Sequence, residues 1–160
     1  MQKLVKVVGI AGCLGVAAIF LFIFYPGWQS ARQFQEGQKY YSLGEWLVSI
    51  QTLRKARPGK LKPEQQFQRR QLIASSYVQL GCYDKALAEY QELLKLSTLN
   101  SQLSTLQYQI AQIYADKLKD PVLAYKNFKI YLKKYPDARY RKDAEVRLKE
   151  EFEKIKEYYK

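Results

Sequence analysis

The pattern of apolar and polar positions divides the chain into two parts. Val7 to Tyr25 form a run of 19 residues without a charge, and after it apolar residues recur at helical spacing to the end of the chain. A helix of about 19 residues spans roughly 29 Å, close to the hydrocarbon thickness of a bilayer. We therefore expect residues 1–28 to form an N-terminal signal-anchor transmembrane helix, ended by Pro26 and Gly27.

Two other interpretations of this segment remain open. A secretory signal would be cleaved near residues 29–31, but the apolar run is longer than the usual core of such signals. Residues 10–13 resemble a bacterial lipobox in which Cys13 would carry a lipid, but the residues after Cys13 stay apolar.

Small residues recur at every fourth position of the apolar run, at Gly9, Cys13 and Ala17. This spacing lets two helix backbones approach closely in lipid, where packing drives association. It predicts a helix partner in the membrane, unless it only reflects the ordinary use of Gly and Ala in membrane helices.

The remaining chain repeats several positions at a nearly constant interval. One aromatic and one small position recur every 37 residues, at Tyr40, Tyr77 and Tyr114 and at Gly37, Ala74 and Ala111. A second small position recurs after 37 and then 38 residues, at Ser49, Ala86 and Ala124. Each unit has two stretches of helical periodicity separated by a turn signal. These signals are Leu43-Gly44, Leu80-Gly81 and Asp120-Pro121. Such repetition predicts a stacked array of helical hairpins.

These units resemble tetratricopeptide repeats, which are paired antiparallel helices with a period of about 34 residues. The resemblance covers residues 29–136, as repeats at about 30–66, 67–103 and 104–136, and the third departs by one inserted residue at Lys117–Asp120. It implies an all-α fold, with an α-solenoid of about three helical hairpins after the transmembrane helix. Residues 137–160 lack the small residues of the repeat, and we expect a C-terminal capping helix there.

The resemblance also implies a binding groove, because the first helix of each hairpin lines the concave surface in this family. The corresponding positions are mostly amide, hydroxyl and aromatic: Phe34, Gln38, Tyr41, Gln71, Ser75, Val78, Tyr108, Gln112 and Ala115. They lack the basic clamp with which chaperone-binding members hold a carboxylate. Such a groove fits a partner segment with few charges. The alternatives are that the chain's own N-terminal linker fills it, or that nothing does.

The charge is strongly positive and unevenly distributed. Lys and Arg number 27 against 15 Asp and Glu, a net charge of +12. One cluster, called the basic patch below, consists of Arg54, Lys55, Arg57, Lys60, Lys62, Arg69 and Arg70. It suits anionic lipid headgroups or an acidic protein, or it only keeps the domain soluble. No nucleic-acid-binding motif accompanies it, so we expect no nucleic-acid partner.

The residue inventory is unfavourable for an enzyme. The chain has no His, the commonest general base and metal ligand. Its sequence contains no phosphate-binding loop, catalytic triad or clustered metal ligands, and we predict no catalytic residue, metal, cofactor or small-molecule substrate. The acids Glu150, Glu151 and Glu153 alternate with lysines on the last helix, and we expect all three to be solvated.

These features together predict a membrane-anchored scaffold that holds partner proteins in a bacterial envelope assembly. Residues 132–144 are similar to tetratricopeptide-repeat proteins of the bacterial envelope. Lys3 and Lys6 precede the apolar run, and the positive-inside rule then places the C-terminal domain outside the cytoplasm. We expect a single-pass protein of the bacterial inner membrane with a periplasmic domain. The alternative is a periplasmic chaperone-like helper that binds unfolded clients near a translocon.

Overall fold

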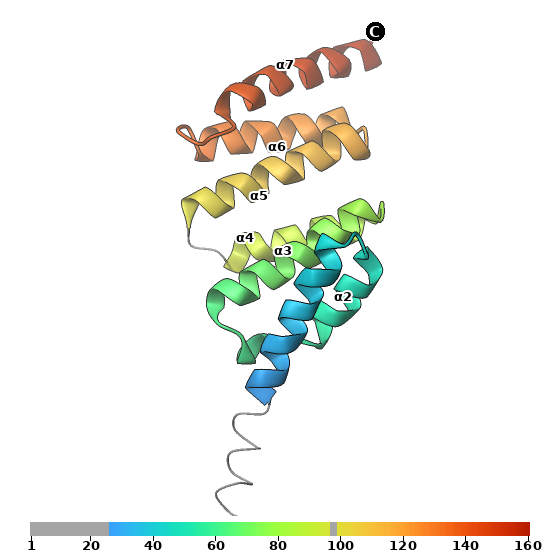
Figure 1. Ribbon diagram of the computed structural model, residues 1–160. Helices are drawn as coiled ribbons and strands as arrows, with labels where there is room; N and C mark the ends of the chain where they lie inside the picture. Colours follow the sequence, from blue (N-terminus) through green and yellow to red (C-terminus); the bar gives the residue numbers. More distant parts are fainter. Residues whose placement is uncertain (1–25, 97–98) are drawn as a thin grey trace, which may run out of the picture. The chain divides into compact units, whose positions relative to one another are not determined.

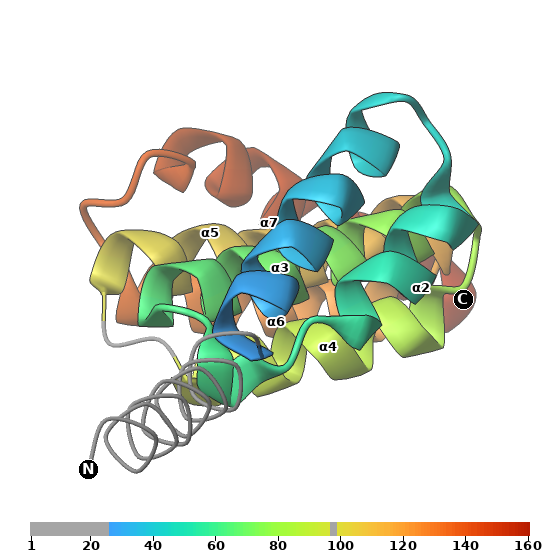
Figure 2. The same cartoon turned by 60° about the horizontal axis from the view of Figure 1, so that its bottom comes forward.

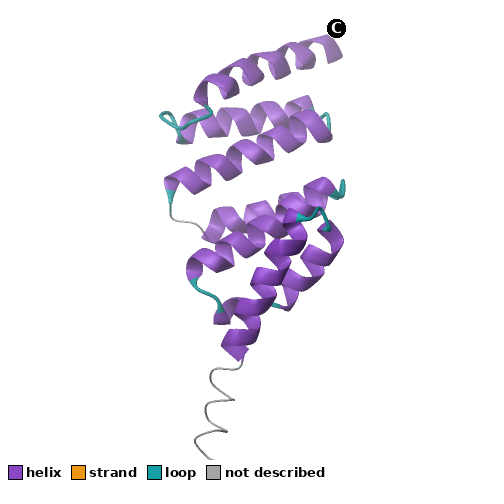
Figure 3. Ribbon diagram, in the orientation of Figure 1, coloured by secondary structure: helices purple, strands orange, loops and turns teal. Residues whose placement is uncertain are grey.

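The computed structural model describes residues 26–96 and 99–160, and this part of the chain is all-helical, as the sequence predicts (Figure 1, Figure 3). Residues 1–25 of the predicted transmembrane segment, with Gly9, Cys13 and Ala17, lie outside the described residues. Pro26 and Gly27, which the sequence predicts to end that helix, instead belong to a helix that continues to residue 42. Among the residues that are described, none of the helices combines the length and the apolar character needed to cross a bilayer.

The helices follow one another with short connections. The first described helix covers residues 26–42. It is followed by α2 (Trp46–Lys55), the 3-10 turn η1 (Pro58–Lys60), α3 (Pro63–Gln79), α4 (Tyr83–Leu96), α5 (Asn100–Gln112), the π-helical η2 (Ile113–Lys117), α6 (Pro121–Lys134) and α7 (Arg141–Tyr158). The chain forms two compact units, Met1–Gln66 and Phe67–Lys160, which are described separately below.

In the first unit, the 26–42 helix and α2 form a hairpin that crosses at a glycine. The Ser49 hydroxyl donates a hydrogen bond to the Gly37 carbonyl oxygen at 2.9 Å. A Cβ atom on Gly37 would lie 2.5 Å from Cδ2 of Leu53, whose side chain is fully buried. The two predicted small positions therefore meet, and only a glycine fits at position 37.

The turn between these two helices also requires glycine. Gly44 adopts a positive φ of 78°, a left-handed conformation that costs side-chain-bearing residues about 1–2 kcal/mol. Tyr41 and Trp46 pack edge to face across this turn, with their ring centroids 5.1 Å apart. Gly81, with a φ of 72°, occupies the equivalent turn between α3 and α4 in the second unit. The Leu-Gly pairs of the sequence therefore mark the hairpin turns.

In the second unit, α3 and α4 form a hairpin that buries the small residues Ala74 and Ala86 completely. Polar contacts join the same two helices. Arg70 pairs with Glu89 at 3.0 Å, and the Ser75 and Tyr90 hydroxyl oxygens lie 3.2 Å apart. The hairpin therefore combines a close helix crossing with ion-pair and hydroxyl contacts beside it.

The third hairpin accommodates its inserted residue by widening the end of its first helix. After α5 the backbone runs as the π-helix η2, and the amide of Asp120 returns to the Tyr114 carbonyl oxygen at 2.9 Å. A π-helical turn takes up one more residue than an α-turn, which explains the interval of 38 instead of 37. The Asp120 carboxylate then caps α6 by accepting from the Leu123 amide at 2.9 Å.

The last helix, α7, packs against α6 and corrects one prediction about its acids. Glu151 is only 1% exposed, so the expectation that it is solvated is wrong. It follows the fully buried Ala144 by seven residues and therefore lies on the same helical face. Lys154, one turn further on, places its Nζ 2.6 Å from a Glu151 carboxylate oxygen and compensates the buried charge.

We predict that Gly37→Ala destabilises the first unit, although Ala favours a helix over Gly by about 1 kcal/mol. The new methyl group would displace the buried Leu53 side chain, and overpacking of this kind costs about 1–3 kcal/mol. Urea unfolding of the full chain in mild detergent, followed by tryptophan fluorescence, measures the change.

Gly27→Ala is the matched control, because a Cβ atom at Gly27 meets no atom within 4 Å. It should leave the free energy of unfolding unchanged or raise it. If Gly37→Ala were as stable as the unsubstituted chain, the close crossing at Gly37 would be refuted.

Candidate partner-binding surface

A hollow of about 330 Å³ separates the N-terminal half of α5 from α3. Amide and hydroxyl side chains dominate its walls, and two apolar residues complete them. The lining residues are Phe67, Gln68 and Gln71 of α3 and Ser101, Gln102, Thr105 and Leu106 of α5. Of the groove positions predicted from the sequence, Gln71 lies here.

A second, larger hollow of about 590 Å³ lies on another side of the same half of α5. It is bounded by Ser101, Ser104 and Thr105 of α5, by Lys134 at the end of α6 and by the connection 135–139. Because Ser101 and Thr105 line both hollows, the two form one continuous candidate surface along α5. We call it the α5 surface.

The chemistry of the α5 surface suits hydrogen bonding to a peptide backbone. The hydroxyls of Ser104 and Thr105 both donate to the Ser101 carbonyl oxygen, at 2.9 and 3.0 Å. Their oxygen lone pairs remain as acceptors, and the glutamine amides of the first hollow supply both donors and acceptors. Charged side chains occur only at the second hollow, where Lys134 and Arg139 outnumber Asp137.

The other predicted groove positions are distributed differently. Gln38 is exposed, and Tyr41, Ser75, Val78 and Gln112 are half-buried, whereas Phe34, Tyr108 and Ala115 are buried. Tyr108 and Ala115 belong to the hydrophobic core of the second unit and offer no surface to a partner. The physical reason is that their side of α5 and η2 faces the interior formed with α6 and α7 rather than solvent.

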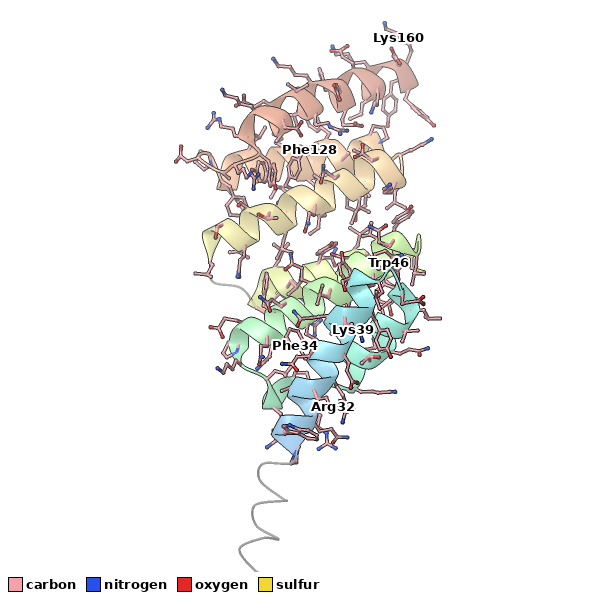
Figure 4. All side chains as sticks on the ribbon, in the orientation of Figure 1. Arg32, Phe34, Lys39, Trp46, Phe128 and Lys160 are labelled. Carbon is pink, nitrogen blue, oxygen red and sulfur yellow. The ribbon has the colours of Figure 1, made fainter. Side chains whose placement is uncertain are left out.

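Tyr108 forms the centre of that core. Its ring stacks on Tyr140 at a centroid distance of 4.5 Å and meets the rings of Phe128 and Tyr131 edge to face, at 5.9 and 5.6 Å. Phe128 lies on α6 (Figure 4). The Tyr108 hydroxyl donates a hydrogen bond to the Asp143 carboxylate at the start of α7.

Burial and the hydrogen bond to Asp143 change the titration of Tyr108. Desolvation, followed by this bond and the negative charge of Asp143, raises the pKa of Tyr108 well above its usual value. Nearby, Arg147 of α7 donates to Asp116 of η2 at 2.7 Å, and this hydrogen bond raises the pKa of the guanidinium. These contacts join α7 to α5 and η2.

The basic patch divides into an exposed and a non-exposed part. Arg54, Lys55, Arg57, Lys60 and Lys62 are exposed and belong to the first unit. Arg69 is 9% exposed, and Arg70 is half-buried in its ion pair with Glu89. Both lie in the second unit on α3 and do not extend the exposed part of the patch, and the Arg70–Glu89 ion pair joins α3 to α4.

The hydroxyl residues of the α5 surface and the 135–139 connection were not among the binding residues predicted from the sequence. The sequence does contain a signal for the hydroxyl residues of the α5 surface. Residues 96–115 carry no charge in a chain that is 26% charged. The 135–139 connection gives no comparable signal, because its contact with α5 is formed only by folding. Within the described ranges, no group of three metal-ligating side chains lies close enough to hold an ion.

Comparison with known proteins gives no relative from which a function could be transferred. The chain matches no protein-family model, and a search of curated proteins finds no significant match. The proposal below therefore rests on the sequence and the geometry.

We predict that Tyr108→Phe destabilises the second unit by about 1.5–3 kcal/mol at neutral pH, the contribution of a hydrogen bond to a charged group. The folded-state pKa of Tyr108 is raised, so its stabilising effect is complete below about pH 10 and decreases as the pH rises further. Thermal unfolding followed by circular dichroism at neutral and alkaline pH tests both points.

The difference in unfolding free energy between the unsubstituted chain and the Tyr108→Phe variant cancels the contribution of the other tyrosines and lysines, because both chains contain them. The difference should shrink as the pH rises above 10. A difference that stayed constant or grew with pH would contradict the buried, hydrogen-bonded position of Tyr108.

Proposed function

We propose that this protein is a membrane-anchored scaffold of the tetratricopeptide-repeat type, which binds a segment of a partner protein along α5. The observation that carries the proposal is the pair of hollows that share Ser101 and Thr105. A ligand that occupies both has a wall of hydroxyl and amide groups along its length. That arrangement fits a peptide chain better than a compact small molecule.

The composition of the α5 surface specifies the partner segment. Phe67 and Leu106 provide an apolar wall in the first hollow, which fits one or two apolar side chains. Lys134 and Arg139 at the second hollow fit an acidic side chain or a C-terminal carboxylate. The expected ligand is therefore a mostly uncharged segment with an acidic residue on one side.

The repeat class is supported by where the small residues lie. Gly37 and Ser49 meet at one helix crossing, and the equivalent residues Ala74, Ala86, Ala111 and Ala124 are fully buried in the later hairpins. Close crossings of this kind are what the repeat pattern requires. The α7 helix, whose Ala144 joins the core of the third hairpin, has the position of a capping helix.

The proposed location rests on the sequence. Val7–Tyr25 has the length and composition of a membrane span, and Lys3 and Lys6 precede it. We therefore place the protein in the inner membrane of a bacterium, as a single-pass subunit with its helical hairpins on the periplasmic side. The anchor would fix the location, and the α5 surface would select the partner.

We predict that Thr105→Arg weakens partner binding about tenfold without unfolding the chain. Thr105 lines both hollows, and a long charged side chain there would fill them, while Arg favours a helix more than Thr does. Purification in mild detergent followed by quantitative mass spectrometry should show the bound partner reduced by about tenfold, equivalent to a loss of roughly 1.4 kcal/mol in binding.

Gln91→Arg is the matched control, because it adds the same charge at an exposed position of α4 that lines neither hollow. It should retain the partner. Equal amounts of partner with both variants would exclude the α5 surface as the binding site. A few partners at integer ratios indicate a scaffold, whereas many clients at low occupancy indicate the chaperone-like alternative.

A further inference from the structure

A buried serine joins two parts of the first unit that are far apart in the sequence. Ser30, which is 2% exposed, donates to the Pro26 carbonyl oxygen at 2.8 Å and accepts from the Arg57 amide at 3.3 Å. This contact holds the connection after α2 against the first turn of the 26–42 helix, and both views show the two side by side (Figure 1, Figure 2).

The consequence is that the exposed basic residues lie beside the start of the described chain. Arg57, Lys60 and Lys62 surround the η1 turn and are all exposed. Gly59 in this turn is also exposed, and a Cβ atom there would meet no atom within 4 Å. Arg57 is 27 residues beyond Ser30 in sequence, yet its amide contacts the first turn of the 26–42 helix, which directly follows the apolar run Val7–Tyr25 in the sequence.

An exposed tryptophan marks the same end of the unit. Trp28 is 59% exposed, and the Arg32 guanidinium lies 5.8 Å from the centre of its ring. Arg32 extends from the lower part of the 26–42 helix (Figure 4). Tryptophan with a neighbouring cation is the combination that favours the headgroup layer of a bilayer, because the ring is amphipathic and the cation meets phosphate.

We infer that Trp28, Arg57, Lys60 and Lys62 form a juxtamembrane patch that docks the first unit on anionic phospholipid headgroups. The inference rests on the proposed membrane anchor and adds to it a defined surface and ligand. Residues 26–66 contain seven basic and three acidic residues, so the unit as a whole is also attracted to negative lipid. Lipid is favoured over an acidic protein because only two residues, Pro26 and Gly27, separate Tyr25 from Trp28.

The experiment uses the full chain in nanodiscs, with an environment-sensitive fluorophore attached at Gly59→Cys. Cys13→Ala and Cys82→Ala remove the two natural cysteines, so the label is unique. Phosphatidylcholine discs are compared with discs that contain one quarter phosphatidylglycerol. The expected result is a blue-shifted emission and reduced iodide quenching only in the anionic discs, reversed by high salt.

The combined variant Arg57→Glu, Lys60→Glu and Lys62→Glu should abolish this shift. Each basic residue near an anionic surface changes the equilibrium about fivefold, so removing three should lower the ratio of docked to undocked protein by about a hundredfold. The matched control is the combined variant Lys117→Glu, Lys126→Glu and Lys142→Glu, at exposed positions of the second unit. It changes the net charge by the same amount and should keep the emission shift. If the glutamate variant misfolds, the combined variant Arg57→Gln, Lys60→Gln and Lys62→Gln tests the contribution of the basic charges to docking.

A second readout separates failure of this inference from failure of the anchor. In a Trp46→Phe background Trp28 is the sole tryptophan, and brominated lipids should quench it if the chain enters the bilayer at Tyr25. Two outcomes overturn the lipid-docking inference alone, provided that Trp28 is quenched. In the first, the emission of the label at position 59 is the same with and without phosphatidylglycerol. In the second, the charge-reversed variant and its control show the same emission shift. Unquenched Trp28 overturns both the anchor and the docking. A shift at 59 that requires an acidic protein and not lipid also overturns the inference.

Discussion

Helix crossings that leave room for no more than a small side chain determine how each hairpin is built. At Gly37 the backbone itself receives the Ser49 hydroxyl at 2.9 Å, and Leu53 occupies the space that a Cβ atom would need. Alanines take the equivalent places in the second unit and are fully buried. Because a close crossing fixes which residues face each other, the turns, the large side chains around it and the exposed faces follow from it.

In the third hairpin, the α5 surface is the part of α5 that α6 and α7 do not cover. The C-terminal half of α5, with Tyr108 and Ala111, is covered by α6 and α7 and closed by the Tyr108–Asp143 hydrogen bond. The N-terminal half, from Ser101 to Thr105, has a hollow on two sides. One half of this short uncharged helix therefore builds the core, and the other half presents hydroxyl and amide groups to the two hollows.

Much of this was predictable from the sequence, and the failures share one cause. The helices, the hairpin turns at Gly44 and Gly81 and the buried small positions follow from local periodicity. The predicted groove positions Phe34, Tyr108 and Ala115 are buried, and the predicted solvation of Glu151 is wrong. Each of these outcomes depends on which neighbour a helical face meets. Periodicity specifies an apolar stripe on a helix but does not specify the partner that covers it.

The sequence by itself determined that the chain is helical, where its hairpins turn, and that a long apolar run precedes them, because these properties depend on residues close together in the chain. Tertiary structure decided which basic residues stay exposed, that Arg57 lies beside Ser30, and that α5 and the 135–139 connection share a hollow. Those facts depend on contacts between residues far apart in sequence. The free energy of such contacts comes from burial and hydrogen bonding that exist only after the chain has folded.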